Sequence, residues 1–247
     1  MTFPLDDLLT VETLIAIVVA VVAGISRGFT GFGSSLIMAP VYAVIYGPVV
    51  TVATVLLLEV AVSVDSFTRV AKIIPWRIMI PMWIMAWLAI PLGMWILFIA
   101  DADILRRAIS AIVAILALLL MIGWRYHGPH RLITNLSVGT MSGALNASTS
   151  LGGPPLIFYL LSGPSTTAAA RAGMISNVFI VSIPTVSYLV LSGALDSFAL
   201  WRTAVLFPFF LVATQIGNRI FQASGEKTYR SASSWLLLIV AVGTFFA

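Results

Sequence analysis

The chain has 247 residues, of which 60% are hydrophobic and 9% are charged, and its formal net charge is +4. Soluble domains carry about 25% charged residues, so this composition excludes an ordinary soluble domain and indicates a polytopic membrane protein. The few basic residues stand at the ends of apolar runs and form no patch, which argues against a nucleic-acid partner. The absence of cysteine excludes disulfides and thiolate metal sites.

Apolar segments follow one another along the whole chain, five in each half. A helix needs roughly 17 to 25 apolar residues to cross a bilayer core, and the last three segments of each half reach that length. The first two segments of each half are short and flank a polar, glycine-rich interruption. The segments are 11–26, 34–46, 48–68, 78–99 and 106–124, then 132–146, 154–162, 171–191, 202–219 and 230–247.

The two interruptions have the composition of a binding site. The first, residues 28–35, reads Gly-Phe-Thr-Gly-Phe-Gly-Ser-Ser, and the second, residues 143–155, reads Gly-Ala-Leu-Asn-Ala-Ser-Thr-Ser-Leu-Gly-Gly-Pro-Pro. The helices that start near Ser34 and Pro154 would direct unpaired N–H groups and the positive end of the helix dipole into the membrane interior, where they attract an anion. Glycine lets the backbone approach a ligand closely. We predict that the interruptions form two halves of one small-anion site.

The two halves also share landmarks in the same order, which indicates an internal duplication. The matched landmarks are Gly47-Pro48 with Gly163-Pro164, Trp76-Arg77 with Trp201-Arg202, Gly93 with Gly217, and Arg106 with Arg230. Residues 11–46 would make a helix of about 54 Å, too long for one span, so the two short segments form a hairpin that is either re-entrant or spanning.

A hairpin followed by three spans crosses the membrane an odd number of times, so the second copy is inverted relative to the first. Many secondary transporters have this architecture. We therefore predict an all-α polytopic membrane protein with one membrane domain, in which residues 1–127 and 128–247 are inverted repeats. Each repeat consists of a short, glycine-broken helical hairpin and three spanning helices.

The basic residues predict the orientation. With the amino terminus outside, Arg106, Arg107 and Arg202 also fall outside, whereas nine other basic residues share the opposite side. These nine are Arg69, Lys72, Arg77, Arg125, Arg131, Arg171, Arg219, Lys227 and Arg230. The side with more Lys and Arg is cytoplasmic by the positive-inside rule, so both termini are expected outside.

Arg27 and Glu59 are ionisable residues at membrane depth, where such residues are usually functional. Arg27 could bind or gate the anion, or it could be a structural partner of a helix end, a carbonyl group or Glu59. Glu59 could carry the proton of coupled transport, or it could be a neutral carboxyl that bonds a neighbouring helix. Asn177, the counterpart of Glu59 in the second repeat, and Gln215 are secondary lining candidates, although such amides more often bond helix to helix.

Residues 28–40, Gly-Phe-Thr-Gly-Phe-Gly-Ser-Ser-Leu-Ile-Met-Ala-Pro, together with the Gly-x-x-x-Gly…Leu-Gly-Gly-Pro-Pro run at 139–155, resemble the sulfite exporter TauE/SafE family. The resemblance covers nearly the whole chain. It implies a multi-pass transporter of the bacterial inner membrane that moves sulfite, sulfoacetate, another organosulfonate or a small organic anion, usually as an exporter. Arg27 departs from the glycine-rich family pattern and could mark a subgroup with its own ligand.

The sequence thus predicts a secondary anion transporter that works by alternating access, with proton coupling through Glu59 as an option and a passive anion channel as the alternative. We expect no enzyme activity, metal or cofactor, because no histidine lies in a span to activate a serine and no set of metal ligands is evident. The expected partners are the anion and the bilayer, with protons and a second copy in a homodimer as open candidates. The predicted substrate-binding residues are Arg27, Thr30, Gly31, Phe32, Gly33, Ser34, Ser35, Asn146, Ser148, Thr149, Ser150, Gly152, Gly153 and Pro154.

Overall fold

A computed structural model describes residues 10–122, 126, 128, 131–160 and 166–223, and every regular element in these ranges is a helix. The elements are α1 (Val11–Thr30), α2 (Ser34–Tyr46), α3 (Pro48–Val70), η2 (Ala71–Ile73), α4 (Trp76–Ile99), α5 (Ala102–Met121), α6 (Leu132–Thr149), α7 (Gly153–Leu160), α8 (Thr167–Leu191) and α9 (Ser197–Ala223). The predicted all-α fold is confirmed. The predicted segment 230–247 lies outside the described residues, as do Gly163-Pro164, Arg125, Lys227 and Arg230.

The helices have the length and surface of a membrane protein. Within the described residues, five helices are long and apolar enough to cross a bilayer: Val11–Thr30, Pro48–Ile73, Trp76–Ile99, Thr167–Leu191 and Ser197–Ala223. Large apolar side chains cover the outer faces; Val18 is 62% exposed and Leu88 is 68% exposed. Soluble monomers seldom expose large contiguous apolar patches, so these faces suit contact with lipid.

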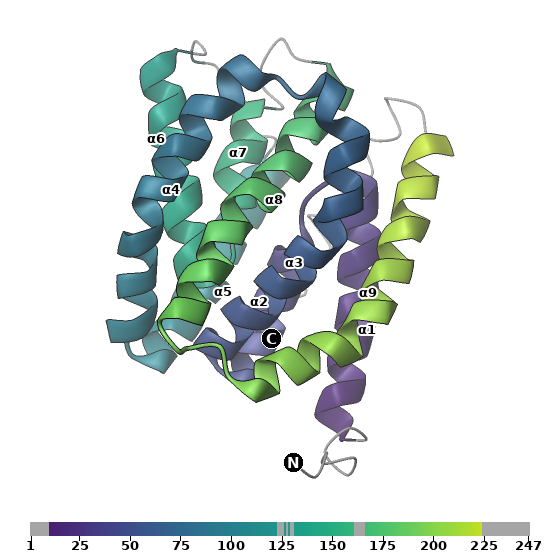
Figure 1. Ribbon diagram of the computed structural model, residues 1–247, viewed down its shortest axis with the longest axis vertical. Helices are drawn as coiled ribbons and strands as arrows, with labels where there is room; N and C mark the ends of the chain where they lie inside the picture. The colour runs from purple at the N-terminus through teal and green to yellow at the C-terminus, as the bar shows by residue number, and fades with distance from the viewer. Residues whose placement is uncertain (1–9, 123–125, 127, 129–130, 161–165, 224–247) are drawn as a thin grey trace.

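Two helix pairs flank a central pair. α1 packs along α9, α4 packs along α6, and α3 packs against α8 between them (Figure 1). The short helix α2 lies in the lower part of this view and the short helix α7 in the upper part, so the two short hairpins approach the middle from opposite ends.

Glycines allow the backbones of both outer pairs to touch. A Cβ atom added to Gly28 would lie 2.1 Å from the carbonyl oxygen of Thr214 on α9, and one added to Gly217 would lie 2.2 Å from that of Ile25 on α1. Because real Cβ atoms are never so close to a backbone oxygen, only glycine fits there. We call the contact around Gly24, Gly28 and Gly217 the α1–α9 seam.

The other outer pair has the same construction. A Cβ atom on Gly143 would lie 2.2 Å from the carbonyl oxygen of Ala86, and one on Gly93 would lie 2.4 Å from that of Ala144. We call the contact around Gly93, Gly139 and Gly143 the α4–α6 seam. Small residues that bring helices close together are the usual device of helix association in membranes.

Replacing Gly143 by Ala should lower the melting temperature of the purified protein in detergent, because the new methyl group meets backbone atoms that cannot rotate away. Overpacking of this kind costs about 1 to 3 kcal/mol. Gly153→Ala is the matched control, since nothing lies within 4 Å of a Cβ atom at Gly153. Equal melting of the two variants would show that the seam tolerates a side chain.

Candidate functional site

The helices continue further into the glycine-rich interruptions than we predicted. α1 ends at Thr30, where Gly31 adopts a left-handed conformation (φ 84°) and its N–H donates to the carbonyl oxygen of Arg27 at 2.7 Å. α6 likewise continues to Thr149, and Ser150 is left-handed with φ 60°. The predicted segment ends at 26 and 146 are therefore wrong, whereas the predicted starts near Ser34 and Pro154 agree with α2 and α7. A left-handed residue at the helix end is a common terminator, and the chain leaves the helix only at residues 31–33, the first break, and 150–152, the second break.

The two breaks are closed by matching threonines. The Thr30 hydroxyl accepts from the N–H of Phe32 at 3.2 Å, and the Thr149 hydroxyl accepts from the N–H of Leu151 at 3.4 Å. Both hydroxyls also donate to carbonyl groups of their own helices. Thr30 and Thr149 therefore shape the breaks.

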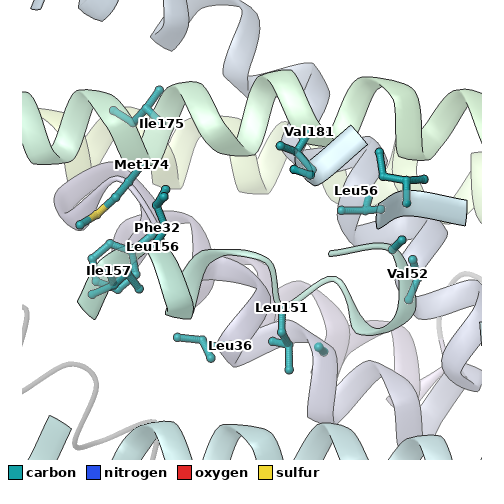
Figure 2. Packing of buried hydrophobic residues seen from close by; sticks show 14 of the residues in the cluster. Phe32, Leu36, Val52, Leu56, Leu151, Leu156, Ile157, Met174, Ile175 and Val181 are labelled. Atoms are coloured by element: carbon teal, nitrogen blue, oxygen red, sulfur yellow. The ribbon is translucent and has the colours of Figure 1, made fainter. Parts of the chain in front are cut away.

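The apolar residue at the centre of each break anchors it in the core. Phe32 is 2% exposed and Leu151 is fully buried. Figure 2 shows Phe32 among Leu156 and Ile157 of α7 and Met174 of α8, which belong to the same buried cluster. The first break is thereby held against helices from the second half of the chain.

The two breaks meet at one pocket. Residues from both breaks line it, together with residues of α2, α3, α6, α7 and α8: Phe32, Gly33, Ser35, Leu56, Glu59, Asn146, Ser150, Gly153, Asn177, Val178 and Ser182. Eight of these are candidates from the sequence: Phe32, Gly33, Ser35, Glu59, Asn146, Ser150, Gly153 and Asn177. The remaining candidates lie outside the lining: Arg27, Thr30, Gly31, Ser34, Ser148, Thr149, Gly152, Pro154 and Gln215. Gln215 is exposed on α9.

Two helix amino termini border this pocket. α2 begins at Ser34 without a side-chain cap, and α7 begins at Gly153. The first N–H groups of a helix lack partners inside the helix and carry partial positive charge. Gly33, Ser35 and Gly153 line the pocket. The start of α2 can therefore offer several N–H groups to an anion there, and the start of α7 can offer that of Gly153 and its dipole, because Pro154 and Pro155 have no N–H.

Arg27 and Glu59 form a buried ion pair beside the pocket. Each residue is 3% exposed, and the Glu59 carboxylate also accepts a hydrogen bond from the Ser34 hydroxyl. The guanidinium of Arg27 donates to the Ser63 hydroxyl. The other two ion pairs within the described ranges are exposed. Of the roles predicted for Arg27, the structure thus has the one in which it is a structural partner of Glu59. Glu59 itself lines the pocket.

Two asparagines join α6 to α8 at the pocket. The Asn146 side-chain amide on α6 donates to Thr185 on α8 at 3.2 Å, and the Asn177 amide on α8 donates to Ser142 on α6 at 3.2 Å. Asn177 was expected to bond a neighbouring helix or to line the site, and it does both.

Arg171 is a residue of the site region to which the sequence analysis gave no role beyond the charge count. It is 8% exposed in α8, and its guanidinium donates to the carbonyl oxygens of Phe29 at 3.2 Å and Gly28 at 2.5 Å. It also donates to Asn218 at 2.7 Å and lies 4.0 Å from the centre of the Phe221 ring. Carbonyl groups at a helix carboxyl end lack partners within the helix and attract cations.

Arg171 therefore caps α1 just before the first break and ties it to α8 and α9. The sequence held one signal for this role. Arg171 stands between small residues, in Ala-Ala-Ala-Arg-Ala-Gly, where a helix can pack closely against its neighbours.

A family model described as sulfite exporter TauE/SafE matches residues 16–244, which include both breaks and every residue of the pocket. The resemblance drawn from the two glycine-rich motifs is thereby confirmed. Searches of curated proteins and of solved structures returned no match.

Proposed function

Because the chain belongs to the sulfite exporter TauE/SafE family of membrane transporters, we propose that it carries sulfite, sulfoacetate or another small organosulfonate or organic anion across the bacterial inner membrane, through the pocket between the breaks. One observation carries this proposal: the amino termini of α2 and α7, from separate halves of the chain, border the same pocket. Two positive helix ends converging on one space inside a membrane protein favour an anion over a cation.

The proposed mechanism is alternating access by two inverted repeats, residues 1–127 and 128–247, with both termini outside. The arrangement of the helices supports it. α1 pairs with α9 and α6 pairs with α4, so the first helix of each half pairs with the fourth helix of the other. The short hairpins also approach the centre from opposite ends (Figure 1).

Glu59 is the proposed proton carrier. Its carboxylate lines the pocket that would receive the anion, and two negative charges in a site of low polarity repel each other strongly. A proton on Glu59 would remove this repulsion, so proton binding and anion binding would favour one another. This coupling predicts that one proton moves with each anion.

Uptake of labelled sulfite into proteoliposomes tests the transport function. We expect uptake that saturates with concentration and is accelerated by sulfite inside the vesicle, because a carrier must return its binding site before each new cycle. Flux that rises linearly and ignores internal sulfite would favour the channel. The absence of saturable flux of sulfite and of every sulfonate in a competing panel would overturn the proposal.

Replacing Glu59 by Gln should separate exchange from coupled transport. Gln keeps an oxygen that can accept from Ser34 and Arg27, but it binds no proton. We expect sulfite–sulfite exchange to persist while accumulation driven by a proton gradient is lost. Melting of the variant in detergent serves as the control for folding, and gradient-driven accumulation by folded E59Q would exclude Glu59 as the proton carrier.

A further inference from the structure

The orientation of the Asn177 amide is fixed by its neighbour Ser142. The Ser142 hydroxyl has one hydrogen, which it donates to the carbonyl oxygen of Gly152 at 2.6 Å. Its oxygen can therefore only accept from Asn177, so the contact at 3.2 Å must come from the NH2 group of the amide. The carbonyl oxygen Oδ1 of Asn177 must then point elsewhere.

The Oδ1 atom of Asn177 has no hydrogen-bond partner among the described residues, although the side chain is 2% exposed and lines the pocket. Buried carbonyl oxygens nearly always accept a hydrogen bond, and an exception needs an explanation. The Ser182 hydroxyl, also buried and also in the pocket lining, is likewise without a partner in the described part of the chain. A ligand in the pocket would supply partners to both.

Other polar groups of the lining already have hydrogen-bond partners. One hydrogen of the Asn146 amide goes to Thr185, which in turn donates to the carbonyl oxygen of Val181 at 2.8 Å. The Ser150 hydroxyl donates to the carbonyl oxygen of Thr149 at 2.6 Å. The Glu59 carboxylate only accepts hydrogen bonds while it is ionised, and the lining contains no Lys, Arg or His.

The pocket is thus lined by both hydrogen-bond donors and acceptors. The donors include the N–H groups at the start of α2 and the N–H of Gly153 at the start of α7, where Pro154 and Pro155 have none. The acceptors include Oδ1 of Asn177 and the carboxylate of Glu59. An anion with acceptor oxygens alone satisfies the helix ends but leaves Oδ1 without a partner. We infer that the pocket selects small sulfur oxyanions that also carry a hydrogen-bond donor, such as hydrogen sulfite or a hydroxyalkylsulfonate, and that Asn177 accepts from that donor.

This inference rests on the proposed function and adds a selection rule to it. Sites built to bond a substrate hydroxyl strongly reject analogues without one, because their own buried polar group is then left unpaired. The rule therefore distinguishes anions of equal charge and nearly equal size.

Competition by matched sulfonates against uptake of labelled sulfite tests the inference. 2-Hydroxyethanesulfonate offers a donor, 2-methoxyethanesulfonate offers an acceptor without a donor, and ethanesulfonate offers neither; all three carry the same charge. We expect the hydroxyl compound to compete at least about tenfold better than the other two, the effect of one unpaired buried acceptor. In Asn177→Leu the three should compete equally.

Two further variants keep the test decisive if Asn177→Leu folds poorly. Ser142→Ala leaves Asn177 in place but frees its amide to turn, so the preference for the hydroxyl compound should fall. Ser137→Ala, the matched control, alters an exposed serine of the same helix and should keep the preference.

Each contrary outcome has a separate meaning. Equal competition by the three sulfonates in the unmodified protein, or an undiminished preference in Asn177→Leu or Ser142→Ala, would overturn the selection rule while sulfite transport stands. The absence of saturable sulfite uptake would instead overturn the proposed function.

Discussion

Replacing Glu59 by Leu is expected to destabilise the folded protein more than replacing Arg27 by Met, and the double variant R27M/E59L should recover most of the loss. Removing one partner of a buried ion pair costs about 3 to 5 kcal/mol, whereas replacing both with apolar groups is often nearly neutral. The two single variants leave different groups without a partner. R27M leaves the Glu59 carboxyl, which can bind a proton and become neutral, whereas E59L leaves the Arg27 guanidinium, which keeps its charge. Thermal unfolding in detergent measures all three.

The exposed pair Asp65–Arg69 is the control for this experiment. Its side chains are 63% and 68% exposed and lie 3.0 Å apart, so the same double-mutant cycle with alanine should give a coupling of about 0 to 1 kcal/mol. Additive losses at Arg27 and Glu59 would show that the two charges do not depend on one another. The folded double variant should also lose accumulation driven by a proton gradient.

Replacing Arg171 by Met should reduce both stability and sulfite transport. Met cannot donate, so the carbonyl groups of Gly28 and Phe29 would lose the guanidinium that bonds them. Each buried polar group left without a partner costs about 1 to 3 kcal/mol. Because these carbonyls precede the first break, we also expect the concentration of sulfite needed for half-maximal flux to rise.

Replacing Arg171 by Lys should rescue little of this loss. An ammonium group lacks the planar fork that bonds two carbonyl groups and Asn218 while stacking on Phe221. Arg219→Lys is the matched control, because Arg219 lies beside Asn218 in sequence but is exposed. Melting and flux close to those of the unmodified protein in R171K would show that charge alone suffices at this position.

The helices of the fold could be predicted because the membrane restricts the backbone structures that a spanning segment can adopt. Every backbone group in the hydrocarbon region must be paired, so apolar runs become helices regardless of tertiary detail. Nine predicted segments correspond to α1–α9. The helix ends could not be predicted equally well, since Gly28 and Gly31 look alike in sequence. The first is a helix residue that touches α9, whereas the second is a left-handed terminator.

The pocket could be predicted in part. Gly33, Ser35, Asn146, Ser150 and Gly153 follow from the rule that polar breaks inside a membrane protein line a cavity. Contacts between residues that are far apart in the sequence leave no comparable pattern in it. The carbonyl oxygen of Phe29 that Arg171 bonds is 142 residues away, and the direction of the Asn177 amide depends on how Ser142 uses a single hydrogen.

The two glycine seams determine which parts of the bundle can move as units. α1 and α4 come from the first half of the chain, yet at the seam glycines their backbones lie directly against α9 and α6 from the second half. A hinge that parted residues 1–127 from 128–247 would have to pull both seams open. If the pocket opens to either side of the membrane as proposed, the seams favour a motion between two mixed bodies, α1 with α9 and α4 with α6, along the boundary where α3 and α8 lie.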